Sequence, residues 1–242
     1  MAGIGVLIAG ASGTGKSDST RGLTDTIWIN AASKRLPFKH KLKTISIFKP
    51  DDLKALTDAQ VLAKVKSELT SDINILNTDD PQVINVAVQY ISDNFPNIKR
   101  IILDDWQYVS ASSVMKKVHS KGYDKWSIFA KEIWDMAKLP EKVRDDLIIY
   151  YLTHTEEYTD SDGVRHLKAK TVGKLVDNLI TLEGMFSIVV YAGVEKTKEK
   201  GIQYLFYTKS EGNDTCKTPR DMFPEEKMEN NLSLIDECIR NF

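Results

Sequence analysis

Ile4-Gly-Val-Leu-Ile-Ala-Gly10-Ala-Ser-Gly-Thr-Gly15-Lys16-Ser17 is the stretch of sequence that decides the fold. Its first part, residues 4–9, is an apolar run with the length and composition of a buried β-strand. Its second part, residues 10–17, matches the pattern GxxxxGK(S/T), in which a glycine-rich loop wraps around phosphate. A strand that leads directly into such a loop predicts a phosphate-binding site in an α/β fold.

The residue types in this loop fit the chemistry of phosphate binding. Gly10, Gly13 and Gly15 permit a tight turn whose backbone N–H groups point at a phosphate, beside the positive end of the helix that we expect to follow. Lys16 would reach the β- and γ-phosphates and Ser17 would ligate Mg²⁺, so the expected cofactors are ATP and Mg²⁺. The alternative, a flexible Gly/Ser loop, leaves the preceding strand unexplained. The predicted nucleotide-binding residues are Gly10, Ala11, Ser12, Gly13, Thr14, Gly15, Lys16, Ser17 and Asp18.

Length and composition favour a single soluble domain. The chain has 242 residues and no Pro/Gly/Ser-rich linker, which favours one domain over residues 1–242, with a core of about 1–212 and a C-terminal extension of about 213–242. Cys216 and Cys238 lack the spacing of a disulfide framework or a zinc site. No apolar run approaches the roughly 18 residues that span a bilayer, and the N-terminus lacks the pattern of a signal peptide. We therefore expect a cytoplasmic protein without a membrane partner.

Apolar runs alternate with helical patterns along the first two thirds of the chain. Continuous apolar runs are typical of parallel strands that are buried on both faces. Helical spacing follows Pro81 and recurs over residues 126–137, where the regular period of a stripe that includes Trp134 favours core packing over an aromatic ligand platform. The runs that we expect to form strands are residues 4–8, 27–29, 73–76, 101–103 and 147–152. The expected architecture is a mostly parallel α/β sheet flanked by helices.

The last part of the chain has a different pattern. Residues 186–192 and 202–207 are apolar segments on either side of a charged, glycine-ended stretch, which predicts a β-hairpin. Apolar residues at helical spacing from about residue 226 to 239 predict a closing helix.

A second candidate element of the site is the segment Arg100-Ile-Ile-Leu-Asp104-Asp105. It is an apolar strand that ends in carboxylates, as a Walker B element does in order to hold the Mg²⁺ shell. An Asp at a strand end is also common as a turn former, so the assignment depends on the preceding loop motif. The predicted metal ligands are Ser17 and Asp104.

The residue that would activate water is left open among carboxylates at strand ends. Asp105 lies beside Asp104, Asp79 and Asp80 follow the run 73–76, and the pair Glu156-Glu157 follows a later strand. In a parallel sheet these strand ends open on one crevice, so each carboxylate is a candidate.

Two of the candidates have a competing interpretation. Asp80 directly precedes Pro81, and an Asp in that position is typical of a helix cap. His154, at the end of an apolar run, would sense the γ-phosphate through a hydrogen bond, or would be a polar strand-end residue without a role. The predicted catalytic residues are Lys16, Asp80, Asp104, Asp105 and His154.

Several segments together resemble a known family. They are residues 10–17, 28–38, 101–105, 152–154, 174–186 and 217–223. They look like the bacteriophage AAA-type P-loop ATP-binding proteins, a family similar to the RecA-like core of the Sak-type single-strand annealing proteins. The resemblance covers nearly the whole chain. It implies a RecA-like P-loop fold and an ATPase that acts on single-stranded DNA, among phage replication and recombination proteins in the host cytoplasm.

The sequence departs from this family in one respect. A RecA-type core usually places a Glu at the end of the strand before Walker B, whereas residues 77–80 read Asn-Thr-Asp-Asp. The resemblance therefore implies slow hydrolysis, or hydrolysis that depends on DNA or on a neighbouring subunit.

The resemblance also predicts where DNA would bind. In RecA-like folds the segments after the Walker B strand and after the next strand face DNA, and both are basic here. The predicted DNA-binding residues are Lys116, Lys117, Lys121, Arg165, Lys168 and Lys170, with Tyr123 as an aromatic that stacks on a base. Lys34, Arg35, Lys39, Lys41 and Lys43 form a third basic cluster. The alternative is that these are solvated faces, since the chain has a net charge of −1.

Other functions and assemblies stay open at this point. An ATP-gated module would assemble with replication proteins without significant turnover. A nucleotide kinase would need an Arg-rich lid, which the sequence does not show. A homo-oligomer, as a ring or filament, would let a cation such as Lys170, Lys174, Lys209 or Arg220 complete a neighbour's ATP site.

Overall fold

The computed structural model describes residues 2–48, 56–116, 124–171, 177 and 179–242. The strands are β1 (Ile4–Gly10), β2 (Thr26–Asn30), β3 (Thr44–Ile45), β4 (Ile75–Asn77), β5 (Arg100–Asp104), β6 (Ile148–Thr159), β7 (Arg165–Ala169), β8 (Ile188–Thr197), β9 (Gly201–Tyr207) and β10 (Lys227–Glu229). The α-helices are α1 (Asp58–Glu68), α2 (Pro81–Asn94), α3 (Gln107–Lys116), α4 (Asp124–Ala137) and α6 (Leu232–Asn241). Three short 3₁₀ helices are η1 (Asp18–Thr20), η2 (Leu139–Lys142) and η3 (Leu182–Met185).

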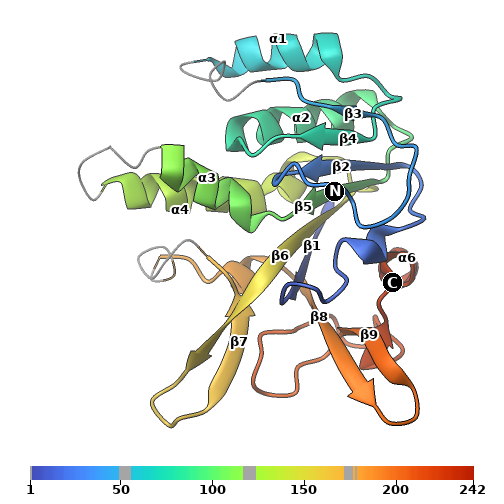
Figure 1. Cartoon of the computed structure of the whole chain (residues 1–242). Coiled ribbons are helices and arrows are strands. Elements are labelled where there is room, and N and C mark those ends of the chain that lie inside the picture. The colour runs from blue at the N-terminus through green and yellow to red at the C-terminus, as the bar shows by residue number, and fades with distance from the viewer. Residues whose placement is uncertain (1, 49–55, 117–123, 172–176, 178) are drawn as a thin grey trace.

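The strands form a mostly parallel sheet in the order β10-β9-β8-β1-β6-β5-β2-β4-β3. All neighbours from β8 to β3 are parallel, whereas β9 and β10 add antiparallel strands at one edge. The far end of β6 leaves the sheet and pairs antiparallel with β7. Figure 1 shows the β6–β7 and β8–β9 ribbons projecting from the same end of the molecule, away from helices α1 to α4. The expected mostly parallel α/β sheet with a C-terminal hairpin is confirmed.

Both faces of the central strands are buried, as the continuous apolar runs predict. Along β1, Leu7 and Ala9 belong to a core that includes Val83 and Phe129 from helices α2 and α4. Their neighbours in β1 belong to a second core, on the other face, which includes the inner side chains of α6. Alternate residues of a strand point to opposite faces, so a strand covered on both sides must be apolar at every position.

Three details differ from the sequence-based expectations. The loop at residues 10–17 is followed by η1, a single 3₁₀ turn, and not by a full helix, because only residues 21–25 separate it from β2. The closing helix begins only at Leu232, because residues 227–229 form β10, which pairs with β9. Asn231 is the N-cap of this helix, and its side chain accepts a hydrogen bond from the backbone N–H of Ser233. Trp134 is 47% exposed, so it lies outside the buried stripe of α4.

Among the described residues, no helix has the length and apolar character that crossing a membrane requires.

Candidate phosphate- and magnesium-binding site

The parallel register brings the predicted site residues to one end of the sheet. Gly10, the last residue of β1, pairs with His154 in β6, and Asp104, the last residue of β5, pairs with Asn30 in β2. These strands are neighbours in the order β1-β6-β5-β2, so Gly10, His154, Asp104 and Asn30 lie at the same level of the sheet, beside the glycine-rich loop. A cavity of about 1130 Å³ opens there. It lies at the carboxyl ends of the parallel strands, where ligands bind in α/β sheets.

The glycines of the loop are required by its backbone. Gly13 and Gly15 have φ values of +81° and +83°, in the left-handed region that glycine adopts without strain. Gly10 has no room for a side chain, because a Cβ there would lie 2.4 Å from the carbonyl oxygen of Ala192. The predicted loop residues that line the cavity are Ser12, Gly13, Gly15, Lys16, Ser17 and Asp18. The other three predicted residues support the loop, since the backbones of Gly10 and Ala11 accept hydrogen bonds and the Thr14 hydroxyl donates to Ala11.

Lys16 lies inside the loop. Its Nζ donates hydrogen bonds of 2.8 Å to the carbonyl oxygens of Gly10 and Ala11, and the residue is only 7% exposed. An ammonium group has three N–H donors, so one donor is left for a ligand in the cavity. Burial lowers the pKa of Lys16 from 10.5 to about 8, although the charges of Asp105 and Asp104 oppose that shift. The protein therefore holds a partly desolvated cation where an anion would neutralise it.

Ser17 and Asp104 meet at the floor of the cavity. The Ser17 hydroxyl donates a hydrogen bond of 2.8 Å to Oδ1 of Asp104. Burial raises the pKa of Asp104 from 3.8 to about 6, because desolvation outweighs the hydrogen bond from Ser17. Two hard oxygen donors side by side are suitable ligands for Mg²⁺.

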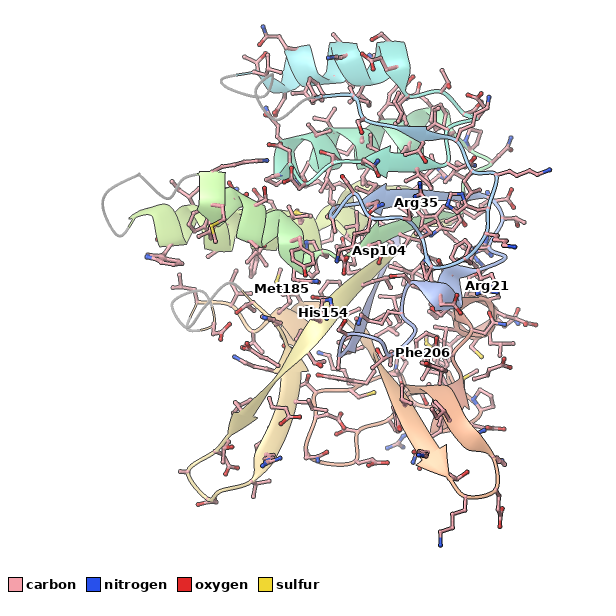
Figure 2. All side chains as sticks on the ribbon, in the orientation of Figure 1. Arg21, Arg35, Asp104, His154, Met185 and Phe206 are labelled. Atoms are coloured by element: carbon pink, nitrogen blue, oxygen red, sulfur yellow. The ribbon has the colours of Figure 1, made fainter. Side chains whose placement is uncertain are left out.

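Asp105 lies next to this pair and has three polar neighbours. Its Oδ2 accepts a hydrogen bond of 3.0 Å from Lys34 Nζ, while Oδ1 lies 3.4 Å from His154 Nε2 and 3.3 Å from Gln107 Nε2. Its φ of +59° is a left-handed conformation that Asp adopts more readily than most residues. Burial and the charge of Lys16 lower the pKa of His154, although Asp105 opposes that shift. Figure 2 shows Asp104 and His154 near the centre of the view, at the end of β5 and partway along β6.

Lys34 enters the site from the loop after β2. The side chain of Asn30 donates a hydrogen bond of 2.6 Å to the carbonyl oxygen of Lys34, which fixes that loop against the strand end. The Lys34 ammonium also lies 4.8 Å from the ring centre of Tyr108, within cation–π range. The hydrogen bond from Lys34 to Asp105 raises the pKa of Lys34. The sequence placed Lys34 in a basic cluster but gave no indication that it approaches Asp105.

Other predicted site residues lie elsewhere. Asp80 is the N-cap of α2, where its side chain accepts hydrogen bonds from the backbone N–H groups of Gln82 and Val83. It does not line the cavity, because β4 is separated from β5 by β2. Glu156 also lies outside the cavity, on the β6–β7 ribbon, where it pairs with Lys168.

The predicted DNA-binding residues fall into three groups: some lie outside the described residues, some form ion pairs, and some are exposed. Lys117, Lys121 and Tyr123 lie outside the described residues. Lys116 pairs with Asp79 at 3.0 Å, and Lys168 pairs with Asp177 at 2.5 Å and with Glu156. Arg165 and Lys170 are exposed, at the start of β7 and just beyond its end. Arg165, Lys168 and Lys170 thus lie on β7 or directly after it, whereas Lys116 lies at the end of α3.

Two residues from the C-terminal part of the chain contact the loop. Asn230 donates a hydrogen bond of 3.3 Å from Nδ2 to the carbonyl oxygen of Thr14. A Cβ at Gly15 would lie 2.9 Å from Oδ1 of Asn230 and 3.2 Å from Cδ1 of Tyr204, so both side chains lie against the loop. No local sequence signal marks either residue, because the contact depends on the pairing of β8 with both β1 and β9.

No protein-family model matches this chain, and no curated protein matches its sequence. Within the described part of the chain, no group of three or more His, Cys, Asp or Glu side chains could hold a metal ion by itself.

Proposed function

We propose that this chain binds ATP with Mg²⁺ at the loop Gly10–Ser17 and hydrolyses it, as a RecA-like P-loop ATPase that acts on single-stranded DNA. The observation that carries the proposal is the 2.8 Å hydrogen bond between Ser17 and Asp104, beside the buried ammonium of Lys16. A loop residue and a strand-end residue far apart in the sequence thus supply a metal site and a phosphate site together.

The residues present fit a magnesium ion that arrives with a nucleotide. Mg²⁺ is usually bound in nucleotide sites by one or two carboxylates or hydroxyls, with water and phosphate oxygens in the other positions. Ser17 and Asp104 would hold the ion, and the ion would neutralise charge on the phosphates. The lack of a larger carboxylate cluster in the described residues agrees with this mode of binding.

Lys16 and the loop backbone would bind the phosphates. The ammonium has one N–H donor beyond its two bonds to carbonyl oxygens, and the positive φ values of Gly13 and Gly15 shape a concave loop. Since η1 is only one turn long, the loop backbone and Lys16 supply the binding, without the N-terminus of a long helix.

Asp105 is the carboxylate that we assign to the attacking water. It lines the cavity beside Asp104, whereas Asp80 caps a helix outside it. His154 would donate a hydrogen bond to the terminal phosphate or to Asp105. Lys34 would stabilise negative charge on the phosphate that is released.

The proposed action on DNA has weaker support in the described residues. Arg165 and Lys170 are exposed near the two ends of β7, and Tyr158 is 45% exposed on the paired strand, so cations and an aromatic ring are available on one ribbon. The same ribbon carries carboxylates at Glu156 and Asp160. The DNA proposal therefore rests mainly on the resemblance of the sequence to phage single-strand annealing proteins.

A second candidate function is an ATP-gated binding module with little turnover. The observation that favours it is that the Asp105 carboxylate already accepts a hydrogen bond from Lys34 and lies close to His154. A carboxylate that already accepts hydrogen bonds from such neighbours has fewer lone pairs free to accept a proton from water, so nucleotide binding with little hydrolysis is consistent with this arrangement.

Phosphate release from ATP, measured with and without single-stranded DNA, tests these proposals. The comparison needs wild type and Asp105→Asn, with Asp93→Asn, which changes an exposed carboxylate on α2, as a matched control. A DNA-stimulated ATPase is supported if DNA increases phosphate release and high salt reduces this increase. Phosphate release should then be lost in Asp105→Asn and kept in the control. ATP binding without release favours the gated module. Release that is unaffected by DNA would contradict the DNA proposal.

A further inference from the structure

The β8–β9 ribbon carries exposed apolar side chains beside the glycine-rich loop. Tyr204 is 49% exposed, Ile202 is 61% exposed, and Val194, which pairs with Tyr204 across the ribbon, is 44% exposed. Ile202 and Tyr204 alternate with the other residues of β9, so they share a face with Phe206, which is fully buried. One face of β9 therefore continues from the hydrophobic core into solvent at the edge of the cavity.

The cavity is larger than a phosphate site needs. Its volume of about 1130 Å³ is slightly above the usual range of sites for whole small ligands, and it extends from Lys16 and Asp104 to Ile202 and Tyr204 on β9. It also includes Arg35 on its other side. Figure 2 labels Arg35, Asp104, His154 and Phe206 in this order from top to bottom of the view. Arg35 belongs to the loop after β2, and Phe206 belongs to β9.

Tyr204 is held at a fixed position relative to the loop. Its carbonyl oxygen accepts a hydrogen bond of 3.2 Å from the backbone N–H of Asn230, whose side chain in turn donates to Thr14. The ring edge lies against Gly15, at 3.2 Å from the position of an added Cβ. The contact is thus built from β9, from the segment after β10 and from the loop itself, while about half of the side chain stays accessible.

We infer that Tyr204 is the platform on which the base of the bound nucleotide stacks. This inference rests on the proposed function, because it assumes that the phosphates bind at Lys16. A nucleotide whose phosphates occupy the loop must extend its sugar and base into the rest of the cavity. Tyr204 is the exposed aromatic residue that borders the described part of that cavity, and an aromatic face gains free energy by stacking on any base.

Calorimetric titration with Mg·ATP and with Mg·tripolyphosphate tests this inference. Tripolyphosphate has the charge of the phosphate chain but no base. We expect Tyr204→Ala to weaken ATP binding about tenfold or more, and to leave tripolyphosphate binding within about twofold. Tyr204→Phe keeps the ring and should bind both ligands as wild type does. Trp134→Ala, which removes a similarly exposed aromatic residue from α4, outside the cavity, is the matched control.

A second readout reports stacking directly. The fluorescence of 2-aminopurine riboside triphosphate is quenched by stacking, so wild type and Tyr204→Phe should quench it and Tyr204→Ala should not. Two results would contradict the assignment of Tyr204 as the base platform while leaving the phosphate site in place. One is that Tyr204→Ala binds ATP as tightly as wild type does, and the other is that it loses the same factor of affinity for ATP and for tripolyphosphate. If wild type binds neither ligand, the proposed function fails, and the inference fails with it.

Discussion

The hydroxyl of Ser17 donates a 2.8 Å hydrogen bond to the carboxylate of Asp104, joining the end of the glycine-rich loop to the end of a strand two positions away in the sheet. Asp104 is 7% exposed, and burial raises its pKa to about 6. A buried carboxylate with so high a pKa destabilises the fold at neutral pH unless a cation compensates it. A cation beside Asp104 would remove this cost, and for that reason we propose that Ser17 and Asp104 bind a metal ion together.

Asp104→Asn should stabilise the ligand-free protein at pH 7. The raised pKa means that the folded chain binds more protons than the unfolded chain between about pH 4 and pH 6, so the free energy of unfolding falls as pH rises through that window. Asn carries no charge, and the variant should gain up to roughly 3 kcal/mol at pH 7. Urea unfolding at pH 4 and pH 7 measures the difference.

The same variant should lose the effect of Mg²⁺. Added Mg²⁺ should tighten ATP binding to wild type but not to Asp104→Asn, because the Asp104 carboxylate is a proposed ligand. An Asp104→Asn protein that is less stable than wild type at pH 7, and that still responds to Mg²⁺, would contradict this account of Asp104.

Gly15→Ala and Gly13→Ala form a matched pair. Both positions have a positive φ, so each alanine is strained by roughly 1 kcal/mol. At Gly13 the added Cβ would have no atom within 4 Å, whereas at Gly15 it would meet Asn230 and Tyr204. Thermal unfolding should therefore show a larger loss of stability for Gly15→Ala. Equal losses would mean that the C-terminal contacts on the loop are unimportant.

Asp105→Asn should separate binding from turnover. We expect ATP hydrolysis to fall about 100-fold or more, as it does on loss of a general base, while the ATP dissociation constant stays within about threefold. The hydrolysis rate of Lys34→Ala should be measured alongside that of Asp105→Asn, because Lys34 donates a hydrogen bond to the Asp105 carboxylate. If the two residues act together, the double variant will be no slower than Asp105→Asn alone, and an additive loss would show independent roles.

Nucleotide binding should take up a proton near pH 8. Burial lowers the pKa of Lys16 to about 8, and a phosphate beside the ammonium would raise it again. At pH 8 part of the ligand-free protein has a neutral Lys16, so ATP binding should draw a proton from the buffer. The calorimetric binding enthalpy should then differ between buffers of different ionisation enthalpy. At pH 6 Lys16 is already charged, so proton uptake by Lys16 should no longer contribute to the binding enthalpy. If the binding enthalpy depends on the buffer in the same way at pH 6 and at pH 8, the lowered pKa of Lys16 is contradicted.

The parts of the site that lie close together in the sequence could be predicted from it. The loop at residues 10–17 is a contiguous pattern, and the strand before it is an apolar run, so both are encoded locally. Asp104 could be assigned because a carboxylate follows a second apolar run. The parallel sheet follows from the same runs, since strands buried on both faces must be apolar throughout.

The remaining contacts depend on strand order, which the sequence does not display. Asp79 and Asp80 were candidates beside Asp105 until the order β1-β6-β5-β2-β4 placed β4 away from the cavity. Asn230 and Tyr204 meet the loop only because β8 joins β9 to β1. The motif predicts a helix where the structure has the single turn η1, because only residues 18–25 lie between the loop and β2.

The most direct test of the central claim is a calorimetric titration of the wild-type chain with Mg·ATP, beside Lys16→Ala and a control, Lys66→Ala, in which an exposed lysine of α1 is removed. The account predicts saturable binding to wild type and Lys66→Ala, with loss of that binding in Lys16→Ala. Equal binding to all three proteins, with Lys16→Ala folded as wild type is, would contradict the assignment of residues 10–17 as the phosphate site.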